Sequence, residues 1–386
     1  MGRSHRRYLI YSDDTSGLGY FRRCSLLAAG IVQSSLDAEV LIVSGSPRAQ
    51  SLPLPDRVES VKLPSAIKDH NGNHRPRAIM GDLGSLVRLR SSILLTVVSH
   101  FDPDVILVDH LPVGLAGELL PVLRSLESAA RRPRLVLGLR DIIDDAALVD
   151  QEWDACGVWE WVDRYDDIFV YGDASIETTA MELGLSERVR SAVTHTGYVA
   201  PRMPDALVAA PSFLVTAGGG ADGHELVRSV LDGADAGVFA GLGLKIVTGP
   251  MMSSSRKAEL MMRAARDPSI EIVEFTDNMR QLISSAAGVI SMAGYNTVVE
   301  EVAADVPALL APRTTPSAEQ DIRADRLSPV TRLERCAVDR MTPERIADFV
   351  LRCVCGIRPS MDRPQLLDLT GVTTATRMLT GGHVAA

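Results

Sequence analysis

The sequence predicts an α/β protein made of two doubly wound domains. Three observations indicate this: the chain has 386 residues, short apolar runs alternate with amphipathic stretches, and the series restarts after a proline-rich segment. A chain of this length exceeds one ordinary core and suggests two domains of roughly 150 to 200 residues. Apolar runs at a pace of one per helix are typical of a parallel sheet covered by helices on both faces.

The first half of the chain contains the first series of elements. The expected strands cover residues 7–12, 38–45, 104–110, 134–141, 166–173 and 193–200. The expected helices cover 21–33, 83–101 and 114–131. Pro201, Pro204 and Pro211 then crowd the segment 200–212, and this composition suits a linker between domains.

The second half repeats the alternation and predicts a second doubly wound domain. Its expected strands cover 213–220, 243–250, 270–275, 288–292 and 307–313. Its expected helices cover 224–234 and 256–266, with one more ending near 286 and another beginning after 294. We therefore expect domains at 1–205 and 206–365, with a C-terminal helix in 366–386 that packs back on the first domain. Two open sheets of this kind are expected to face one cleft with the carboxyl ends of their strands.

Composition narrows the function classes. A net charge of −9 and an aromatic content of 4% argue against binding nucleic acid, which favours basic surfaces and stacking side chains. The five cysteines form neither a disulfide framework nor a zinc pattern. No signal peptide and no apolar run of about 18 to 20 residues is evident. We expect a cytoplasmic monomer or homodimer with at most peripheral membrane contact.

Two glycine-rich loops follow predicted strands. In "SDDTSGLGYFRR" (12–23), Gly17 and Gly19 allow either a tight turn or a close approach to a ligand. In "VTAGGGADGHE" (215–225), the glycines stand between a strand and a helix, where successive backbone amides favour an anion. The glycines expected to face phosphate are Gly218, Gly219 and Gly220.

A third element is "AAGVISMAGYNTVVEEVA" (286–303), in which Gly294 is expected to let the chain turn from strand into helix. The helix start comprises Tyr295, Asn296 and Thr297, with Asn or Thr available as a cap. Glu300 lies about a turn and a half further along, within reach of hydroxyls beside a bound anion. Adjacent helical residues point about 100° apart, so Glu301 is expected to be solvated.

The segment "TTPSAEQDIRADRL" (314–327) is expected to carry Glu319 and Gln320 in a loop after a strand. A carboxylate and an amide side by side accept and donate hydrogen bonds to sugar hydroxyls.

These stretches resemble a known family. "EFTDNMRQLISSAAGVISMAGYNTVVEEVAADVPALLAPR" followed by "EQDIRADRL" is similar to the C-terminal donor domain of nucleotide-sugar glycosyltransferases with two Rossmann domains, the B type. The subgroup resembled is the N-acetylglucosaminyltransferase that acts on the lipid-linked intermediate of peptidoglycan synthesis, with its predicted relatives. "DDTSGLGYFRR", "RLVLGLRDIIDD" and "VTAGGGADG" resemble those predicted relatives.

The resemblance implies roles for individual residues. Glu300 matches the acid that binds the ribose hydroxyls, and Gly294 matches the turn before the helix that faces the diphosphate. Thr276 matches the position whose backbone reads the base, with Met279 beside it, and Glu319 and Gln320 match the residues that hold the donor sugar. Tyr20 stands where the family usually has histidine, and Met292 where it usually has arginine or a small polar residue.

The resemblance predicts a metal-independent, inverting transfer from a UDP- or dTDP-sugar to a hydroxyl or amine, with no cofactor besides the donor. The catalytic candidates are His110, Asp14 and Tyr20, with Asp13, Asp109 and Asp141 as further bases at strand ends. The acceptor candidates are Gly17, Gly19, Arg22, Asp109 and Arg140. A structural role for His110, helix capping by Asp14 and surface pairing of the arginines are the alternatives.

Two other functions stay open. A nucleotide-sugar 2-epimerase shares this fold, and Tyr20 in place of histidine is compatible with an inactive sugar-nucleotide-binding partner protein. The acceptor is expected to be a natural product or a cell-envelope intermediate.

Overall fold

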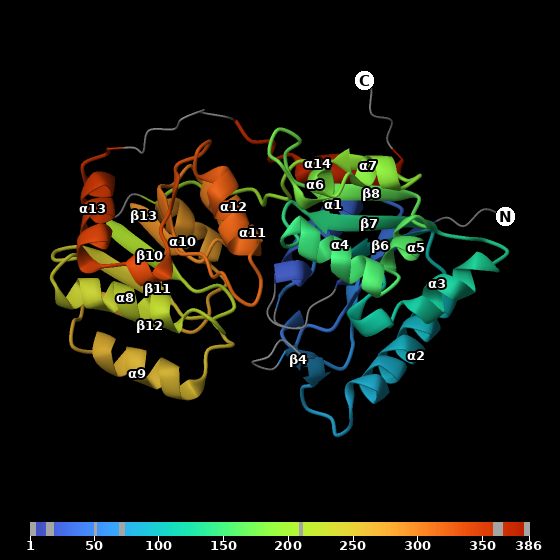
Figure 1. Cartoon of the computed structure of the whole chain (residues 1–386), viewed down its shortest axis with the longest axis horizontal. Coiled ribbons are helices and arrows are strands. Elements are labelled where there is room, and N and C mark those ends of the chain that lie inside the picture. Colours follow the sequence, from blue (N-terminus) through green and yellow to red (C-terminus); the bar gives the residue numbers. More distant parts are fainter. Residues whose placement is uncertain are drawn as a thin grey trace. The chain divides into compact units, whose positions relative to one another are not determined.

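The computed structural model describes residues 5–12, 19–49, 52–68, 74–207, 211–357 and 366–381. The chain divides into two compact units, Met1–Val199 with Asp368–Ala386 and Ala200–Leu367 (Figure 1). Each unit is built on a parallel sheet, which confirms the prediction of two doubly wound α/β units.

The first unit contains a seven-stranded parallel sheet in the described part of the chain. Its spatial order is β3 (Val58–Lys62), β2 (Ala38–Ser44), β1 (Arg6–Ser12), β6 (Val105–Asp109), β7 (Arg134–Arg140), β8 (Asp167–Tyr171) and β9 (Ala192–His195). β4 (Ala66–Lys68) and β5 (His74–Pro76) form a separate antiparallel pair. The order of the large sheet reverses between β1 and β6, and ligands of open α/β sheets bind beside the strand ends at such a reversal.

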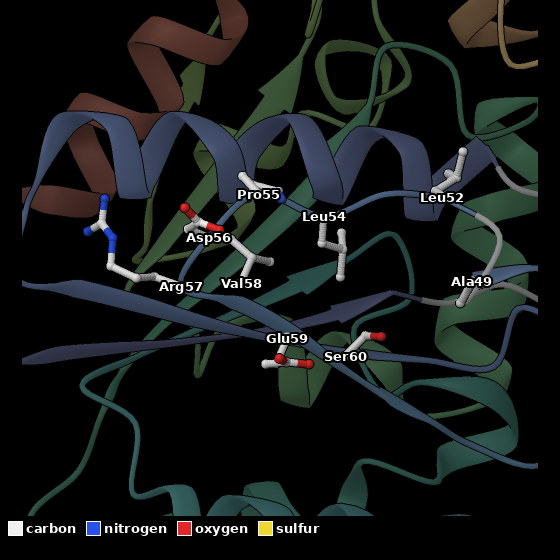
Figure 2. Close-up of a pocket in the computed structure, with 9 residues that line it drawn as sticks. All are labelled: Ala49, Leu52, Leu54, Pro55, Asp56, Arg57, Val58, Glu59 and Ser60. Atoms are coloured by element: carbon white, nitrogen blue, oxygen red, sulfur yellow. The ribbon is translucent and has the colours of Figure 1, made fainter.

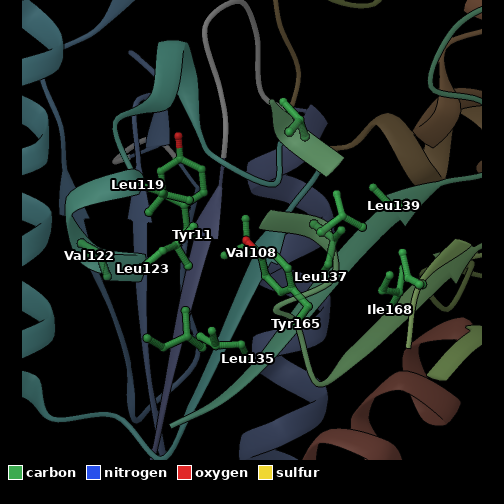
Figure 3. Packing of buried hydrophobic residues seen from close by; sticks show 14 of the residues in the cluster. Tyr11, Val108, Leu119, Val122, Leu123, Leu135, Leu137, Leu139, Tyr165 and Ile168 are labelled. Carbon is green, nitrogen blue, oxygen red and sulfur yellow. The ribbon is translucent and has the colours of Figure 1, made fainter. Parts of the chain in front are cut away.

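Helices cover both faces of this sheet. They are α1 (Gly19–Ser34), α2 (Leu83–Phe101), the 3-10 helix η2 (Leu115–Gly117), α3 (Leu120–Glu127), α4 (Ala146–Ala155), α5 (Val158–Val162), α6 (Thr179–Glu182), α7 (Leu185–Arg188) and α14 (Gly371–Thr380). One face buries alternate strand residues against α2 to α7, as Tyr11, Val108 and Leu137 show in Figure 3. α1 packs on β1 and β2, and α14 packs against α1 (Figure 1).

The packing of α1 against α14 depends on a glycine. A side chain at Gly30 would place its Cβ 2.4 Å from Thr376 Oγ1, so only glycine lets the two helices approach this closely. The chain leaves the first unit after Val199 and re-enters it at Asp368. These two points are neighbours, since Tyr198 N–H donates to Asp368 O over 2.7 Å.

The second unit contains a six-stranded parallel sheet among the described residues. Its spatial order is β12 (Ile270–Val273), β11 (Gly243–Val247), β10 (Ser212–Thr216), β13 (Gly288–Ser291), β14 (Ala308–Leu310) and β15 (Leu333–Arg335). Its helices are α8 (His224–Asp235), α9 (Ser254–Ala264), α10 (Met279–Ser285), α11 (Tyr295–Ala303), α12 (Glu319–Leu327), η3 (Val338–Arg340) and α13 (Pro343–Val354). The strand order reverses between β10 and β13.

Several expected elements differ from the structure, and the strands expected over 193–200 and 243–250 end early, at His195 and Val247. The helix expected over 114–131 is split into η2 and α3, because Gly114, Ala116 and Gly117 adopt left-handed φ values of 69°, 48° and 82°. The strand expected over 213–220 ends at Thr216, before the glycines. Glu319 and Gln320 lie in the first turn of α12 and not in a loop, so the loop prediction is wrong.

Candidate functional site

Three loops lie side by side at the carboxyl edge of the second sheet, because they follow three neighbouring strands. β13 pairs with β10 on one side and with β14 on the other. Their following segments are the glycine loop 217–223, the turn 292–294 and the loop 311–318. The turn after β13 therefore lies between the other two loops, at the strand-order reversal where an open α/β sheet binds its ligand.

The glycine loop contains two kinds of glycine. Gly220 has a φ of 91°, and a Cβ there would lie 2.3 Å from Thr248 O, so the backbone packing at this position requires glycine. Gly218 and Gly220 use their own amides inside the loop, donating to Thr216 Oγ1 and Ala217 O. Gly219 is exposed, and a Cβ there would meet nothing within 4 Å among the described residues. Open space beside Gly219 fits a loop that a ligand approaches.

The turn between β13 and α11 differs from its expected form. The left-handed residue is Ala293, with a φ of 58°, while Gly294 has a φ of −67° and is the N-cap of α11. The prediction that Gly294 makes the turn is wrong. The expected Asn or Thr cap is wrong as well, because the N-cap is Gly294, which has no side chain. Asn296 and Thr297 lie in the first turn, half-buried.

A buried arginine that was not predicted holds this turn. Arg323 of α12 is 1% exposed and donates through Nη1 to Ala293 O over 3.2 Å. Its guanidinium also lies 5.6 Å from the ring centroid of Tyr295, the first residue of α11. The "EQDIRADRL" motif contains this arginine, and the signal that could have found it was its place in the same motif as Glu319. The hydrogen bond from Arg323 stabilises the strained backbone conformation of Ala293.

Both acids of α11 are buried. Glu300 is 2% exposed and Glu301 is 0% exposed, so the prediction that Glu301 is solvated is wrong. Adjacent helical residues point about 100° apart, so Glu300 and Glu301 face different directions. Both are nevertheless buried, because this part of α11 is covered on more than one side. Burial and the neighbouring Glu300 raise the pKa of Glu301 to about 8, while the nearby Ser291 hydroxyl acts in the opposite direction. Glu301 is therefore protonated at neutral pH.

The donor-sugar candidates lie in the first turn of α12. Glu319 is 6% exposed and its N–H donates to Ser317 Oγ. Gln320 accepts from the Arg313 backbone N–H through Oε1 over 3.1 Å, so its amide oxygen also fixes the loop after β14. Arg313 in turn forms an ion pair with Asp222 of the glycine loop.

The base-reading candidates lie further away along the same edge. Thr276 lies between β12 and α10, Met279 is the first residue of α10, and β12 is separated from β13 by two strands. Thr276 Oγ1 accepts from the Asn278 N–H over 3.1 Å and so shapes its own loop. The structure brings together the glycine loop, the α11 start and the α12 start, and leaves Thr276 at the outer part of the sheet.

In the first unit, Tyr20 and His110 come together at the reversal of the first sheet. Their rings stack with centroids 4.8 Å apart and planes inclined by 22°. Arg23 and Arg140 lie over the Tyr20 ring, with guanidinium carbons 5.2 and 5.1 Å from its centroid. Tyr20 follows β1, His110 follows β6 and Arg140 ends β7, so neighbouring strands bring these side chains together.

His110 has an unusual backbone conformation. Its φ is 82°, in the left-handed region that non-glycine residues rarely adopt, and its N–H donates to Gly138 O over 2.8 Å. Local strain of this kind is held by surrounding structure and is common at functional sites.

Asp109 forms a buried ion pair with Arg23. It is 0% exposed and accepts through both carboxylate oxygens from Arg23, over 3.1 and 2.7 Å. Burial raises the pKa of Asp109, although the Arg23 ion pair acts in the opposite direction. Both carboxylate oxygens of Asp109 are thus engaged by Arg23, and the expected acceptor contact of Asp109 stays a prediction. Arg23 was not predicted, although it neighbours Arg22 in the first glycine segment.

The remaining first-unit candidates are more scattered. Gly19 is exposed and opens α1, Arg22 is half-buried on the same helix, and Asp141 is buried beyond the end of β7. Asp13, Asp14 and Gly17 lie outside the described residues.

A separate hollow of about 540 Å³ lies beside the edge strand β3 (Figure 2). Ala49, Leu52 and residues 54–60 line it, and none of the predicted site residues is among them. Among the described residues, no three His, Cys, Asp or Glu side chains group as metal ligands, and no helix is long and apolar enough to cross a membrane.

Residues 214–358 match the glycosyltransferase family 28 C-terminal domain. No curated protein matches the chain. Solved structures with a similar fold include the glycotransferase of kitacinnamycin, at a TM-score of 0.60 and 13% identity over 99% of this chain and 96% of that one. MurG of Acinetobacter baumannii is similar at a TM-score of 0.55 and 12% identity, over 97% of this chain and 99% of that one.

The fold is shared with a second kind of enzyme. The UDP-GlcNAc 2-epimerase of Methanocaldococcus jannaschii is similar at a TM-score of 0.59 and 12% identity, over 98% of this chain and 100% of that one. Identities this low show the fold, whereas the domain match is specific to glycosyltransferases. The recognition of a B-type glycosyltransferase from the sequence is thereby confirmed. The chain has the B-type fold of two Rossmann-like units, and its second unit contains a glycosyltransferase family 28 C-terminal domain, which supports a glycosyltransferase.

Proposed function

We propose that the protein transfers a sugar from a UDP- or dTDP-sugar to a hydroxyl or amine of an acceptor, with inversion and without a metal ion. The observation that carries this proposal is the family 28 domain match over the unit whose carboxyl edge combines the glycine loop with the start of α11. A nucleotide diphosphate is the ligand chemistry that suits such an edge.

The donor half of the proposal uses the second unit. The start of α11 and the Gly219 loop supply fixed dipoles for the diphosphate, and Glu319 and Gln320 stand beside them for the sugar. Glu300 is proposed for the ribose hydroxyls. At 2% exposure its carboxylate is reached only by a ligand seated directly against α11.

The acceptor half uses the cluster in the first unit. We propose His110 as the base: its imidazole takes the proton of the acceptor hydroxyl as that oxygen bonds to the anomeric carbon. The bond from the anomeric carbon to the diphosphate breaks, and its electron pair leaves with the nucleotide diphosphate. Tyr20 fixes the plane of the imidazole by stacking, and the left-handed backbone at His110 fixes its position.

The test is transfer by purified protein from UDP- and dTDP-sugars to a panel of natural-product aglycones and lipid-linked cell-envelope intermediates. The variant His110→Gln should lower kcat by about 10²- to 10⁴-fold with donor affinity unchanged, because general-base catalysis contributes about that much. Donor turnover that is independent of His110 would reject its role as base.

The epimerase fold neighbour supports one alternative function. Incubation with UDP-GlcNAc and no acceptor separates the two, since only an epimerase forms the epimer by itself. Tight nucleotide binding with no product from any acceptor would instead support an inactive binding partner. A cytoplasmic location and a monomeric or dimeric state stay predictions.

A further inference from the structure

Arg313 and Asp222 form an ion pair across the carboxyl edge of the second sheet. Arg313 Nη1 lies 2.7 Å from Asp222 Oδ2. Arg313 follows β14 and Asp222 belongs to the loop after β10, while β13 runs between these two strands. The ion pair therefore spans the end of the middle strand.

The glycine loop lies directly against that strand end. A Cβ added at Gly223, next to Asp222, would lie 3.4 Å from Met292 Sδ. Met292 comes immediately after β13 and opens the turn into α11. The ion pair thus stands over the turn at which the donor diphosphate is proposed to bind.

A backbone hydrogen bond holds Arg313 in place, while part of its guanidinium is available to donate further hydrogen bonds. Its N–H donates to Gln320 Oε1 over 3.1 Å, which ties it to the first turn of α12. Its side chain is 28% exposed, and its Nε is buried without a hydrogen-bond partner in the described part of the chain. A guanidinium carries five N–H donors in a planar fork, a shape that matches phosphate oxygens.

We propose that Arg313 is the cationic ligand of the donor diphosphate and that Asp222 is its counter-ion before the donor binds. This inference rests on the proposed function, since it names the charge that the donor site supplies to the leaving diphosphate. When the nucleotide binds, the guanidinium exchanges the Asp222 carboxylate for phosphate oxygens. Asp222 is 43% exposed, so water solvates it after the exchange.

An ordinary surface ion pair is the competing explanation, and the chain contains a matched example. Arg332 Nη1 lies 2.6 Å from Asp305 Oδ2, with side chains 21% and 65% exposed. These residues precede the parallel strands β15 and β14, so their pair lies at the amino edge of the same sheet. Arg332→Gln therefore removes a comparable pair away from the site.

The experiment is calorimetric titration of the full chain with UDP and dTDP. Arg313→Gln should weaken binding about ten- to hundredfold, the value of a charge-assisted hydrogen bond, and Arg313→Lys should recover part of it. Asp222→Asn should bind as tightly as the wild type or a few times more tightly, because a competing anion is gone. Arg332→Gln should match the wild type, and unfolding midpoints of all variants report whether they are folded.

The two partners of the pair are thus expected to respond in opposite directions. Equal weakening by Arg313→Gln and Asp222→Asn would show a structural pair and overturn the inference, as would full affinity in folded Arg313→Gln. In both cases nucleotide binding by the wild type leaves the proposed function standing. If the wild type binds neither UDP nor dTDP, the proposed function itself fails and the inference falls with it.

Discussion

The imidazole of His110 stacks on the phenol of Tyr20, with ring centroids 4.8 Å apart. The two residues are 90 positions apart in the sequence and meet because β1 and β6 are neighbours in the sheet. Tyr20 takes the place at which the resembled family has histidine, and the stack supplies this protein with a histidine at the same sheet edge.

The Tyr20 ring, and not its hydroxyl, is expected to matter for activity. Tyr20→Phe should keep kcat, whereas Tyr20→Leu should lower kcat about two- to tenfold, since an aromatic pair contributes about 0.5 to 1.5 kcal/mol. Initial rates at saturating donor measure both, and the donor KM should stay constant. Equal losses in the two variants would assign the role to the hydroxyl.

Glu301 is expected to make stability depend on pH. Its pKa rises from 4.5 to about 8 on folding, so the folded state binds more protons than the unfolded state between these values. Stability attributable to Glu301 therefore falls as pH rises through this window, by up to about 1.4 kcal/mol per pH unit, and levels off above pH 8.

The variant Glu301→Gln tests this dependence because it resembles the protonated side chain at every pH. Its free energy of unfolding relative to the wild type should grow between pH 5 and 8, as measured by urea unfolding at each pH. Taking the difference between the two proteins cancels all other titrating groups. A difference that stays constant with pH would mean that Glu301 is ionised in the folded protein.

The Asp109–Arg23 pair is expected to be structural. Asp109→Asn removes the carboxylate that pairs with a guanidinium that is 1% exposed, which should lower the free energy of unfolding by about 3 to 5 kcal/mol. Glu160→Gln removes an exposed i,i+4 partner of Arg164 and should cause no resolvable change. Denaturant unfolding of both variants gives the comparison, and an unaltered midpoint in Asp109→Asn would contradict the buried pairing.

Neighbouring glycines of the donor loop are expected to respond differently to alanine. Gly220→Ala should destabilise the fold by at least about 1 to 3 kcal/mol, because its φ of 91° is left-handed and its Cβ would meet Thr248 O. Gly219→Ala has open space and should fold normally but weaken UDP or dTDP binding. Thermal midpoints and titration calorimetry separate the two effects. Unchanged nucleotide affinity in Gly219→Ala would place the ligand away from this loop.

Much of the fold was predictable because strand periodicity and glycine punctuation are local signals. The runs 7–12, 104–110 and 134–141 became β1, β6 and β7 within a few residues of their expected ends. The helix expected over 114–131 was wrong because left-handed residues interrupt it, and only the backbone reveals Ala116 as one of them. Glu319 and Gln320 were wrongly placed in a loop because their helix lacks a side-chain cap that would have announced its start.

The sequence by itself determined the class of fold, and it predicted the second glycine loop and the helix after β13 as parts of the proposed nucleotide-sugar site. Only the tertiary structure decided which charges are buried and which side chains meet. Glu301 and Asp109 were assigned to water and to a ligand, respectively, yet both are enclosed, since burial depends on elements distant in sequence that cover a helix or a strand end. Arg23, Arg313 and Arg323 have their roles for the same reason, because each partner comes from a different strand or helix that parallel packing brings to the same sheet edge.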